Sequence, residues 1–353
     1  MTIIYFLILL SVIICIHEAG HLITAKMFGV YCYEYAFGMG PTLFKKQGKE
    51  TVYSIHAIPI GGFVAMAGET EGDEVYPDVV VPEGRRINDI KPWKRIIVML
   101  AGVFMNFMLA WVIFSMIYLS IGAYGRSPKP YVESVMENTP AERAGFESGD
   151  LVVSISLNDG TSVKPKDFTD MQMFLAQYAD QELIYVVERN GQNVSIPVTP
   201  EYNEERDSYM IGIIGPDLEI EEVNLLNCWR YGAEEMSSIA GLLVRTLRQL
   251  IRGKGLNQLA GPVGIYNATA EYASLGFLSF MFLMAELSLN VGIMNLLPLP
   301  VLDGGQVVLV LAEKVIGKPL NHKLKAAIMG VCWVILISIM VFVTWNDISR
   351  LFR

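Results

Sequence analysis

Five residues near the start of the chain, His17-Glu18-Ala19-Gly20-His21, have the types and the spacing of a zinc-binding motif. Residues four apart lie on one face of a helix, so the two imidazoles can bind a single Zn²⁺ ion. Glu18 lies one step round the helix, where it can accept a proton from water at the metal. Chance matches to so short a motif are common in soluble helices, so these five residues alone leave both interpretations open.

The motif lies toward the end of an apolar segment, Ile3–Met27, which is long enough to cross a bilayer core of about 30 Å. A charged residue and two histidines are costly to bury in such a segment, so their presence indicates a functional site. Unlike a signal peptide, the segment has no basic residues before its apolar run and no small-residue cleavage site after it. We therefore expect a retained membrane span that carries the chemistry.

The composition of the 353 residues is that of an integral membrane protein, because 52% are hydrophobic and only 18% are charged. The mean hydropathy is +0.40. The formal net charge of −9 argues against a nucleic-acid partner, which would need a basic face. The cysteines lack the close spacing of a thiolate metal site and are interpreted as small apolar residues. They are Cys15, Cys32, Cys228 and Cys332.

Three more segments are long and apolar enough to span the membrane, namely Ile96–Gly122, Leu275–Leu297 and Ala326–Trp345. The sequence thus predicts an α-helical integral membrane protein with about four transmembrane helices. Lysines and arginines gather in the connections that follow the first and third spans, and the positive-inside rule places both connections in the cytoplasm. The end of the first span that carries the histidines then lies toward the cytoplasmic face.

Between the first two spans, Thr51–Gly68 alternates apolar and polar residues around a Pro/Gly-rich turn, which predicts a membrane-associated β-hairpin. Such an apolar hairpin can dip into the bilayer where protein or water covers its backbone. His56 lies within the alternation, and we expect a structural role for it rather than metal binding. The stretch Glu69–Glu83 is acidic without one basic residue and predicts a solvated loop.

A change in composition near Tyr124 predicts a soluble α+β domain on the outer side of the membrane, inserted between the second and third spans. Three of its segments, Thr139–Ala141, Ala144–Phe146 and Gly149-Asp150, resemble the motif of PDZ domains. PDZ domains add an extended peptide to a sheet edge, so the resemblance implies peptide binding. A folded plug or spacer that binds nothing is the alternative.

The chain returns to the membrane through an acidic stretch, Glu201–Glu222, interpreted as a connector. Leu225–Arg252 predicts an amphipathic helix that lies either in the membrane interface or on the PDZ-like domain. We therefore expect four parts: an N-terminal membrane core (1–123), a PDZ-like domain (124–215), the connector with its amphipathic helix (216–265) and a C-terminal membrane core (266–353).

A catalytic zinc usually has three protein ligands and an open position for water. Asp303 is the remaining acidic candidate at membrane depth on the cytoplasmic side, and it follows a helix broken at Pro298 and Pro300. Broken helices at such depth line cavities. Glu286 within the third span can face this cavity or pair near the interface. Asn106 in the second span can hydrogen-bond across helices, and generic helix packing is the other interpretation.

The segment Asn295–Gly305, taken together with the His17–His21 motif, resembles the site-2 protease family of intramembrane zinc metalloproteases. Further similarities are the Gly61-Gly62-Phe63 loop, Gly102–Asn106, the single PDZ-like insert and Gly261–Ile265. The similarity extends over essentially the whole chain. Gln306 departs from the pattern, because histidine is frequent at this position in the family.

This resemblance implies that His17, His21 and Asp303 bind Zn²⁺ and that Glu18 is the catalytic base. Asn295 would contact the substrate backbone, and further substrate-binding candidates are Gly61, Gly62, Phe63 and Asn106. The family also implies regulated cleavage of single-span proteins, such as anti-sigma factors or signal-peptide remnants, in the inner membrane of a bacterium. An unwound substrate strand could pair with the edge of the Thr51–Gly68 segment, while the PDZ-like domain excludes bulky ectodomains.

Two other classes of function remain open on the sequence alone. A metal-dependent enzyme or transporter would use the same ligands on another substrate. A catalytically inert membrane scaffold would only present the PDZ-like domain. The presence of Glu18 together with all three candidate ligands argues against the scaffold.

Overall fold

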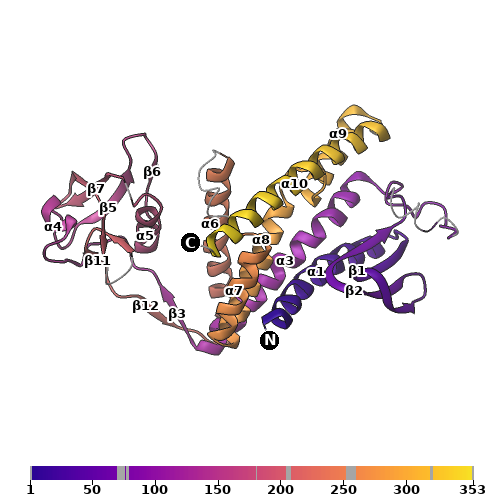
Figure 1. The fold of residues 1–353 in the computed structure, drawn as a ribbon, viewed down its shortest axis with the longest axis horizontal. Coiled ribbons are helices and arrows are strands. Elements are labelled where there is room, and N and C mark those ends of the chain that lie inside the picture. The colour runs from indigo at the N-terminus through magenta and orange to yellow at the C-terminus, as the bar shows by residue number, and fades with distance from the viewer. Residues whose placement is uncertain are drawn as a thin grey trace. The chain divides into compact units, whose positions relative to one another are not determined.

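The chain folds as two compact units, shown in Figure 1. The computed structural model describes residues 2–69, 76, 79–179, 181–203, 208–251, 260–318 and 321–351. The first unit, which we call the membrane unit, comprises Met1–Ser120 and Asn224–Arg353, and the second, the inserted unit, comprises Ile121–Val223. Each unit has its own hydrophobic core.

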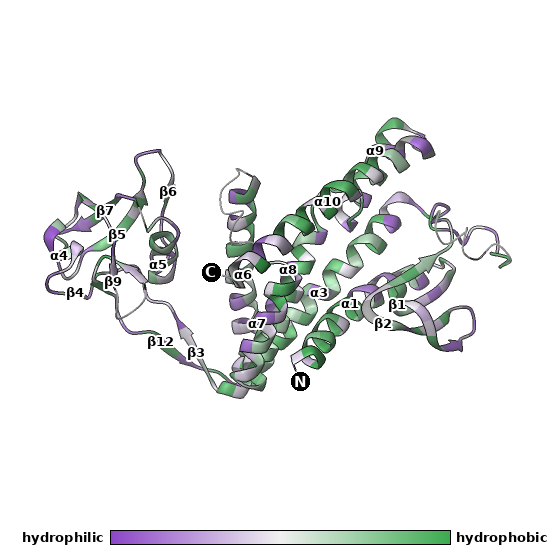
Figure 2. Cartoon of the chain, viewed as in Figure 1, coloured by the Kyte–Doolittle hydropathy of each residue, from purple (hydrophilic) through white to green (hydrophobic). Residues whose placement is uncertain are grey.

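Within the described residues, four helices of the membrane unit are long and apolar enough to cross a bilayer. They are α1 (Thr2–Met27), α3 (Pro92–Ile121), α8 (Phe277–Asn295) and α10 (His322–Leu351). Figure 2 shows the apolar character along them. The expected helical membrane protein with about four spans is therefore confirmed, with helix ends that differ by a few residues from the expected ones.

Helices α1, α3 and α8 share an apolar core in which Leu9, Phe114 and Leu289 are almost completely buried. Gly20 brings α1 and α3 together, because a Cβ atom at this position would collide with the backbone carbonyl of Ala101. Small residues at a crossing let two membrane helices approach closely. The two helices are therefore in contact beside the paired histidines.

The predicted amphipathic helix is α6 (Cys228–Ile251). Its apolar side chains, including Met236 and Leu243, pack against the core of α1, α3 and α8. The Nε1–H of Trp111 on α3 also donates to the carbonyl oxygen of Trp229 at 2.9 Å. The apolar face of α6 is thus partly covered by helices of the membrane unit itself.

Among the described residues, the membrane unit has two shorter helices as well, α7 (Pro262–Ser274) and α9 (Asp303–Ile316). The side chain of Asp347 on α10 is buried, and its Oδ2 accepts the backbone N–H groups of Gly261 (2.9 Å) and Gly264 (2.8 Å) at the start of α7. A carboxylate is favourable at a helix N-terminus, where the backbone N–H groups have no helical partner. This contact joins α10 to α7.

The connection between α1 and α3 contains two long paired strands, β1 (Cys32–Gln47) and β2 (Val52–Met66). Both strands bend, so that Tyr35 of β1 pairs with Val64 on one side and with Tyr53 on the other. Two bent strands therefore build a sheet wider than a simple hairpin.

The predicted hairpin inside Thr51–Gly68 is wrong, because these residues form the single strand β2 and pair with β1. Residues 52–55 and 62–65 do not pair with each other; they run in opposite directions on the two sides of residues 34–37 of β1. Gly61, between these two stretches, has φ +87°, a conformation that glycine adopts without strain. The acidic stretch that follows lies mostly outside the described residues. Its Tyr76 stacks on Tyr33, with ring centroids 5.0 Å apart, and its hydroxyl donates to Glu34.

The inserted unit is built on a four-stranded antiparallel sheet in the order β6-β5-β7-β8. The strands are β5 (Leu151–Ser156), β6 (Ser162–Val163), β7 (Leu183–Arg189) and β8 (Gln192–Val198). The predicted turn at Asn190-Gly191 joins β7 to β8, and both residues have the positive φ that a tight hairpin turn requires. Ile155 on β5 and Tyr185 on β7 are fully buried in the hydrophobic core of this unit.

The other described elements of the inserted unit are two helices, α4 (Pro140–Ala144) and α5 (Phe168–Gln177), and short strand pairs. The pairs are β3 (Ala123–Arg126) with β12 (Glu219–Glu222), β4 (Ser134–Val135) with β11 (Ile213–Ile214), and β9 (Glu201–Asn203) with β10 (Ser208–Met210). The stretch from Glu201 to Glu222, interpreted from sequence as a connector, therefore supplies four of these strands.

Candidate metal centre

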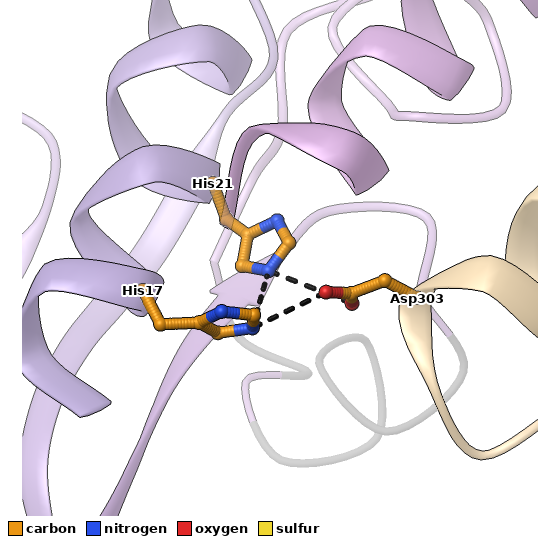
Figure 3. A group of neighbouring side chains, drawn as sticks. All are labelled: His17, His21 and Asp303. Atoms are coloured by element: carbon orange, nitrogen blue, oxygen red, sulfur yellow. Dashed lines mark hydrogen bonds and ion pairs between the residues drawn. The ribbon is translucent and has the colours of Figure 1, made fainter. Parts of the chain in front are cut away.

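Three side chains from opposite ends of the sequence converge inside the membrane unit, as Figure 3 shows. His17 and His21 lie on one face of α1, and Asp303 is the first residue of α9. The two Nε2 atoms are 3.2 Å apart, and the Asp303 carboxylate lies 3.2 Å from His17 Nε2 and 3.6 Å from His21 Nε2. Both histidines are buried.

These distances match a tetrahedral metal site. Zinc binds nitrogen and oxygen ligands at about 2.0–2.2 Å, so that neighbouring ligand atoms lie roughly 3.4 Å apart. Among the described residues, these three are the only group of histidine, cysteine or carboxylate ligands found within 4.8 Å of one another. The buried Oδ2 atom of Asp303 also has no hydrogen-bond donor in the described part of the chain.

The direction of the His21 ring agrees with a metal ligand. Its Nδ1 lies 2.8 Å from the backbone carbonyl oxygen of Val98, to which it can only donate. In the neutral imidazole this leaves Nε2 as a bare acceptor facing His17 and the Asp303 carboxylate. Acceptors that face one another in a buried position repel, and a cation between them removes that repulsion. The donor set therefore fits a divalent metal ion.

Two glycines allow Asp303 to reach this position. The chain folds back on itself between the end of α8 and the start of α9, and Cβ atoms at Gly304 and Gly305 would collide with the backbone of Leu296 and Leu299. Gln306 supports the same turn through a hydrogen bond from its Nε2 to the carbonyl oxygen of Pro300. The glycines are thus required by close backbone approach, and Gln306, which also lines the cavity, stabilises the turn.

Glu18 lies beside the cluster and against β2. The backbone N–H of Val64 donates to its carboxylate. A Cβ atom at Gly62 would lie 3.6 Å from Glu18 Cγ, so the bend in β2 brings the strand close to this side chain. Glu18 also lines a cavity of about 410 Å³ together with both histidines and Asp303.

Comparison with known sequences identifies the family. The family described as Peptidase family M50 matches residues 5–339 of the chain. The chain belongs to peptidase family M50.

The sequence similarity to bacterial relatives extends over nearly the whole chain. The chain is 31% identical to the regulator of sigma-W protease RasP of Bacillus subtilis and 32% identical to the zinc metalloprotease RasP of Bacillus licheniformis. It is 31% identical to the zinc metalloprotease RasP of Oceanobacillus iheyensis. Each alignment covers 99% of this chain and 99% of the relative.

Two of the five predicted substrate-binding residues of this M50 peptidase line the cavity. Asn295 ends α8 with its Nδ2 3.5 Å from His17 Nε2, and both Asn295 and Phe63 line the cavity. Gly61 and Gly62 form the bend of β2 next to Phe63. The cavity wall is otherwise largely apolar; its lining includes Ile14, Val64, Met66, Val291, Val301 and Leu302.

Asn106 occupies a different place from the other candidates. It is fully buried on α3, it is not among the residues that line the cavity, and its Nδ2 lies 3.3 Å from His17 Nδ1. Its side chain therefore contacts the rear of a candidate ligand, and this contact is the hydrogen bond across helices that the sequence predicted as one of two interpretations.

Gly102 is a site residue whose position the sequence did not explain. A Cβ atom there would lie 2.5 Å from His21 Nε2 and 2.8 Å from His17 Nε2, so only glycine leaves room for both rings. A glycine four residues before a buried asparagine in an apolar span was the available signal, but its partner could not be read from α3 alone.

His56 and Glu286 lie outside the metal group. His56 Nδ1 is 2.7 Å from the carbonyl oxygen of Gly40, and its Nε2 is 3.0 Å from Ser54 Oγ and 3.6 Å from Glu34 Oε1. These contacts within the β1–β2 sheet agree with the structural role expected for His56. Glu286 lies on α8 and is not part of the described three-residue group.

Proposed function

We propose that this zinc metalloprotease of family M50 hydrolyses peptide bonds in the membrane-spanning segments of anchored proteins. One observation carries this proposal: the His17–His21–Asp303 cluster and Glu18 open on a single cavity inside a unit made of apolar spanning helices. Membership of peptidase family M50 supports the chemistry. The zinc metalloprotease names of the relatives support the metal.

In this proposal His17, His21 and Asp303 hold the ion and leave one position open toward the cavity. A bound zinc ion supplies Lewis-acid chemistry, which polarises the scissile carbonyl and acidifies water. Glu18 is not a ligand, so its carboxylate is available to accept the proton of the attacking water and to deliver it to the leaving amine. The hydrogen bond from the Val64 N–H orients that carboxylate.

A substrate helix shields its own carbonyl groups, so it must unwind before cleavage. Residues 62–66 of β2 pair with β1 along one side, and the described pairings include no strand on their other side. Phe63, Val64 and Met66 of the same stretch line the cavity. An unwound substrate segment can therefore add to this edge, with Gly61 and Gly62 keeping the approach open.

Asn295 is the candidate for holding the substrate backbone at the reacting bond. Its amide lies at the cavity beside His17, and a carboxamide can both donate to a carbonyl oxygen and accept from an N–H group. This role places Asn295 in contact with substrate and not with the ion.

We infer that the substrates are single-span proteins of a bacterial cell membrane, with anti-sigma factors and signal-peptide remnants as the leading classes. The name of the Bacillus subtilis relative, regulator of sigma-W protease, supports the first class. The lysines between α1 and α3, including the exposed Lys45, Lys46 and Lys49, support a cytoplasmic position for that connection and for the nearby metal centre.

The inserted unit is proposed to be a PDZ-like domain on the outer side that excludes substrates with large folded ectodomains. Its antiparallel sheet and the helix that begins at Pro140, within the Thr139–Phe146 segment, support the PDZ resemblance. A cavity of about 410 Å³ between α5 and the strand β11, lined in part by Phe168, Gln172 and Ile214, is available for a peptide. Exclusion by size does not require that this cavity be filled.

The decisive experiment is co-expression of the chain with a library of tagged single-span proteins, compared with its Glu18→Gln variant. Wild type should cut a subset within the membrane segment, whereas Glu18→Gln should bind zinc normally and cut none, since the base is lost and the ligands remain. Turnover by Glu18→Gln would refute its assignment as base. Zinc uptake without cleavage of any member by wild type would favour the transporter or scaffold alternatives.

A further inference from the structure

One face of α3 runs behind both histidines. Val98, Gly102 and Asn106 are spaced four residues apart, so they lie along one face of α3 just as His17 and His21 do on α1. Val98 contacts His21, Gly102 contacts both rings, and Asn106 contacts His17. The second helix thus supplies one polar partner for each imidazole, with a gap for the rings between them.

The His21 half of this arrangement has a defined polarity. A backbone carbonyl can only accept, so the Val98 oxygen requires a proton on His21 Nδ1 and leaves Nε2 bare. A metal-binding imidazole commonly donates its other N–H in this way, which sets both its tautomer and its orientation. His17 needs an equivalent acceptor if its Nε2 is to face the same ion.

The group available to His17 is the Asn106 carboxamide, which can donate or accept according to which of its ends faces the ring. These two orientations differ by a half-turn of the amide and are assigned from chemistry. With nitrogen toward the ring, an N–H would meet the Nδ1–H of a metal-binding His17, and Oδ1 is left buried without a donor among the described residues. With oxygen toward the ring, Oδ1 accepts that proton.

Resting on the proposed zinc function, we propose that Asn106 is a positioning residue that holds His17 as a metal ligand. Its Oδ1 accepts the Nδ1–H of His17, so that the ring presents a bare Nε2 to the ion. The side-chain oxygen of Asn106 then accepts the Nδ1–H of His17, just as the backbone oxygen of Val98 accepts the Nδ1–H of His21.

The residues around Asn106 restrict the position of its side chain. The residue is fully buried, so bulk water does not replace its amide at the ring. Ser288 of α8 donates its hydroxyl to the Asn106 backbone carbonyl at 2.9 Å. Gly292 of α8 also lets the helices approach, since a Cβ atom there would lie 2.6 Å from a ring carbon of Phe107, the residue next to Asn106. Asn106 is thus held between α1 and α8 with its amide beside His17.

The test is the zinc affinity of the full chain in lipid nanodiscs, measured by competition with a chelating dye, for Asn106→Asp and Asn106→Leu. Aspartate keeps an acceptor oxygen toward Nδ1, whereas leucine has a similar shape and no acceptor. Outer-shell partners of metal-binding histidines are worth about 10–100-fold in metal affinity. We expect a loss of that size in Asn106→Leu and near-wild-type affinity in Asn106→Asp.

A matched control and a spectroscopic readout separate positioning from general damage to the fold. Ser115→Ala removes another buried polar group of α3, one that bonds within its own helix to Trp111, and it should leave zinc affinity unchanged. With Co²⁺ in place of zinc, Asn106→Asp should keep the visible absorption of wild type, and Asn106→Leu should shift or lose it.

Each outcome decides the inference. Equal zinc affinity in wild type and Asn106→Leu, or an Asn106→Asp variant as weak as Asn106→Leu, would overturn the role of Asn106 while leaving the zinc centre intact. A wild-type chain that takes up no zinc would instead refute the metal centre itself, and the positioning role with it.

Discussion

Asp150 of the inserted unit and Asp303 of the membrane unit both have buried carboxylate oxygens, but the groups around these oxygens differ. Asp150 is fully buried, and both of its oxygens accept from Arg189 at 2.7 Å. The backbone N–H of Glu147 adds a bond of 2.9 Å. Asp303 faces two imidazole nitrogens, and its buried Oδ2 has no hydrogen-bond donor among the described residues.

The difference separates a structural carboxylate from a ligand. Burial of a charge is tolerated when a partner charge and hydrogen bonds compensate for lost hydration, and Asp150 has both. Asp303 keeps unused acceptor capacity next to two other acceptors, which is favourable only when a cation joins them. Unsatisfied acceptors that converge therefore indicate function more clearly than burial or charge alone.

Asp303→Asn should have the largest effect, because it removes the only anionic ligand. Outer-shell partners alone are worth about 10–100-fold in metal affinity, so the loss of a ligand should exceed about 100-fold, and proteolysis should fall to background. Metal content per chain and cleavage of a single-span substrate measure this. Unchanged zinc content would exclude Asp303 from the coordination shell and turn attention to Glu286.

Removal of the inserted unit should change which substrates are cut. Deleting residues 127–218 and joining Arg126 to Glu219 through a short Gly/Ser bridge keeps the β3–β12 pairing. Substrates with intact ectodomains should then be cut at the rate of pre-trimmed ones, whose own rate should hardly change. If trimmed substrates lose most of their cleavage in a folded, zinc-loaded variant, the unit recruits substrates and the size-exclusion hypothesis fails.

Arg189→Met should lower the stability of the inserted unit and leave zinc affinity untouched. Breaking a buried pair is costly because it leaves an uncompensated charge, and we expect about 2–4 kcal/mol, reduced by the partial exposure of the Arg189 side chain. Hydrogen exchange of the β5 and β7 amides in the full chain measures it. Arg143→Met is the control, since the exposed Arg143–Glu201 pair should contribute only about 0–1 kcal/mol. A change in zinc content would contradict the expectation that zinc binding is independent of the stability of the inserted unit.

The smallest effect should appear in the response of the inserted unit to acid. Burial alone would raise the pKa of Asp150, but the hydrogen bonds from Arg189 and the Glu147 N–H outweigh burial and hold this pKa below its ordinary value. The stability from Asp150 is therefore complete above the ordinary carboxyl pKa of about 4 and is lost as pH falls through the lowered value. The protection factors of the β5 amides, which are corrected for the intrinsic pH dependence of exchange, should fall below about pH 4 in wild type. If the Asp150→Asn variant shows the same acid response, the response comes from other carboxylates and not from Asp150.

Local patterns were sufficient for the spans and the histidine pair of the membrane unit and for one turn of the inserted unit. The spans follow from runs of apolar residues, and the pairing of His17 with His21 follows from helical spacing, because both depend only on neighbours in sequence. The β7–β8 turn at Asn190-Gly191 follows from the conformational freedom of its two residues. The resemblance of Asn295–Gly305 to a known family added Asp303 as an expectation.

Long-range packing decided the rest. The strand β2 pairs with β1 and not with itself, since the register depends on a partner segment that the alternation within Thr51–Gly68 does not specify. The span that contains Asn106 predicted a hydrogen bond across helices or generic packing, but only the approach of α3 to α1 shows that its partner is His17. The sequence by itself determined which residues could bind a metal. Only the tertiary structure decided that Asp303 meets them, because two glycines let the backbone fold tightly enough to bring α9 to α1.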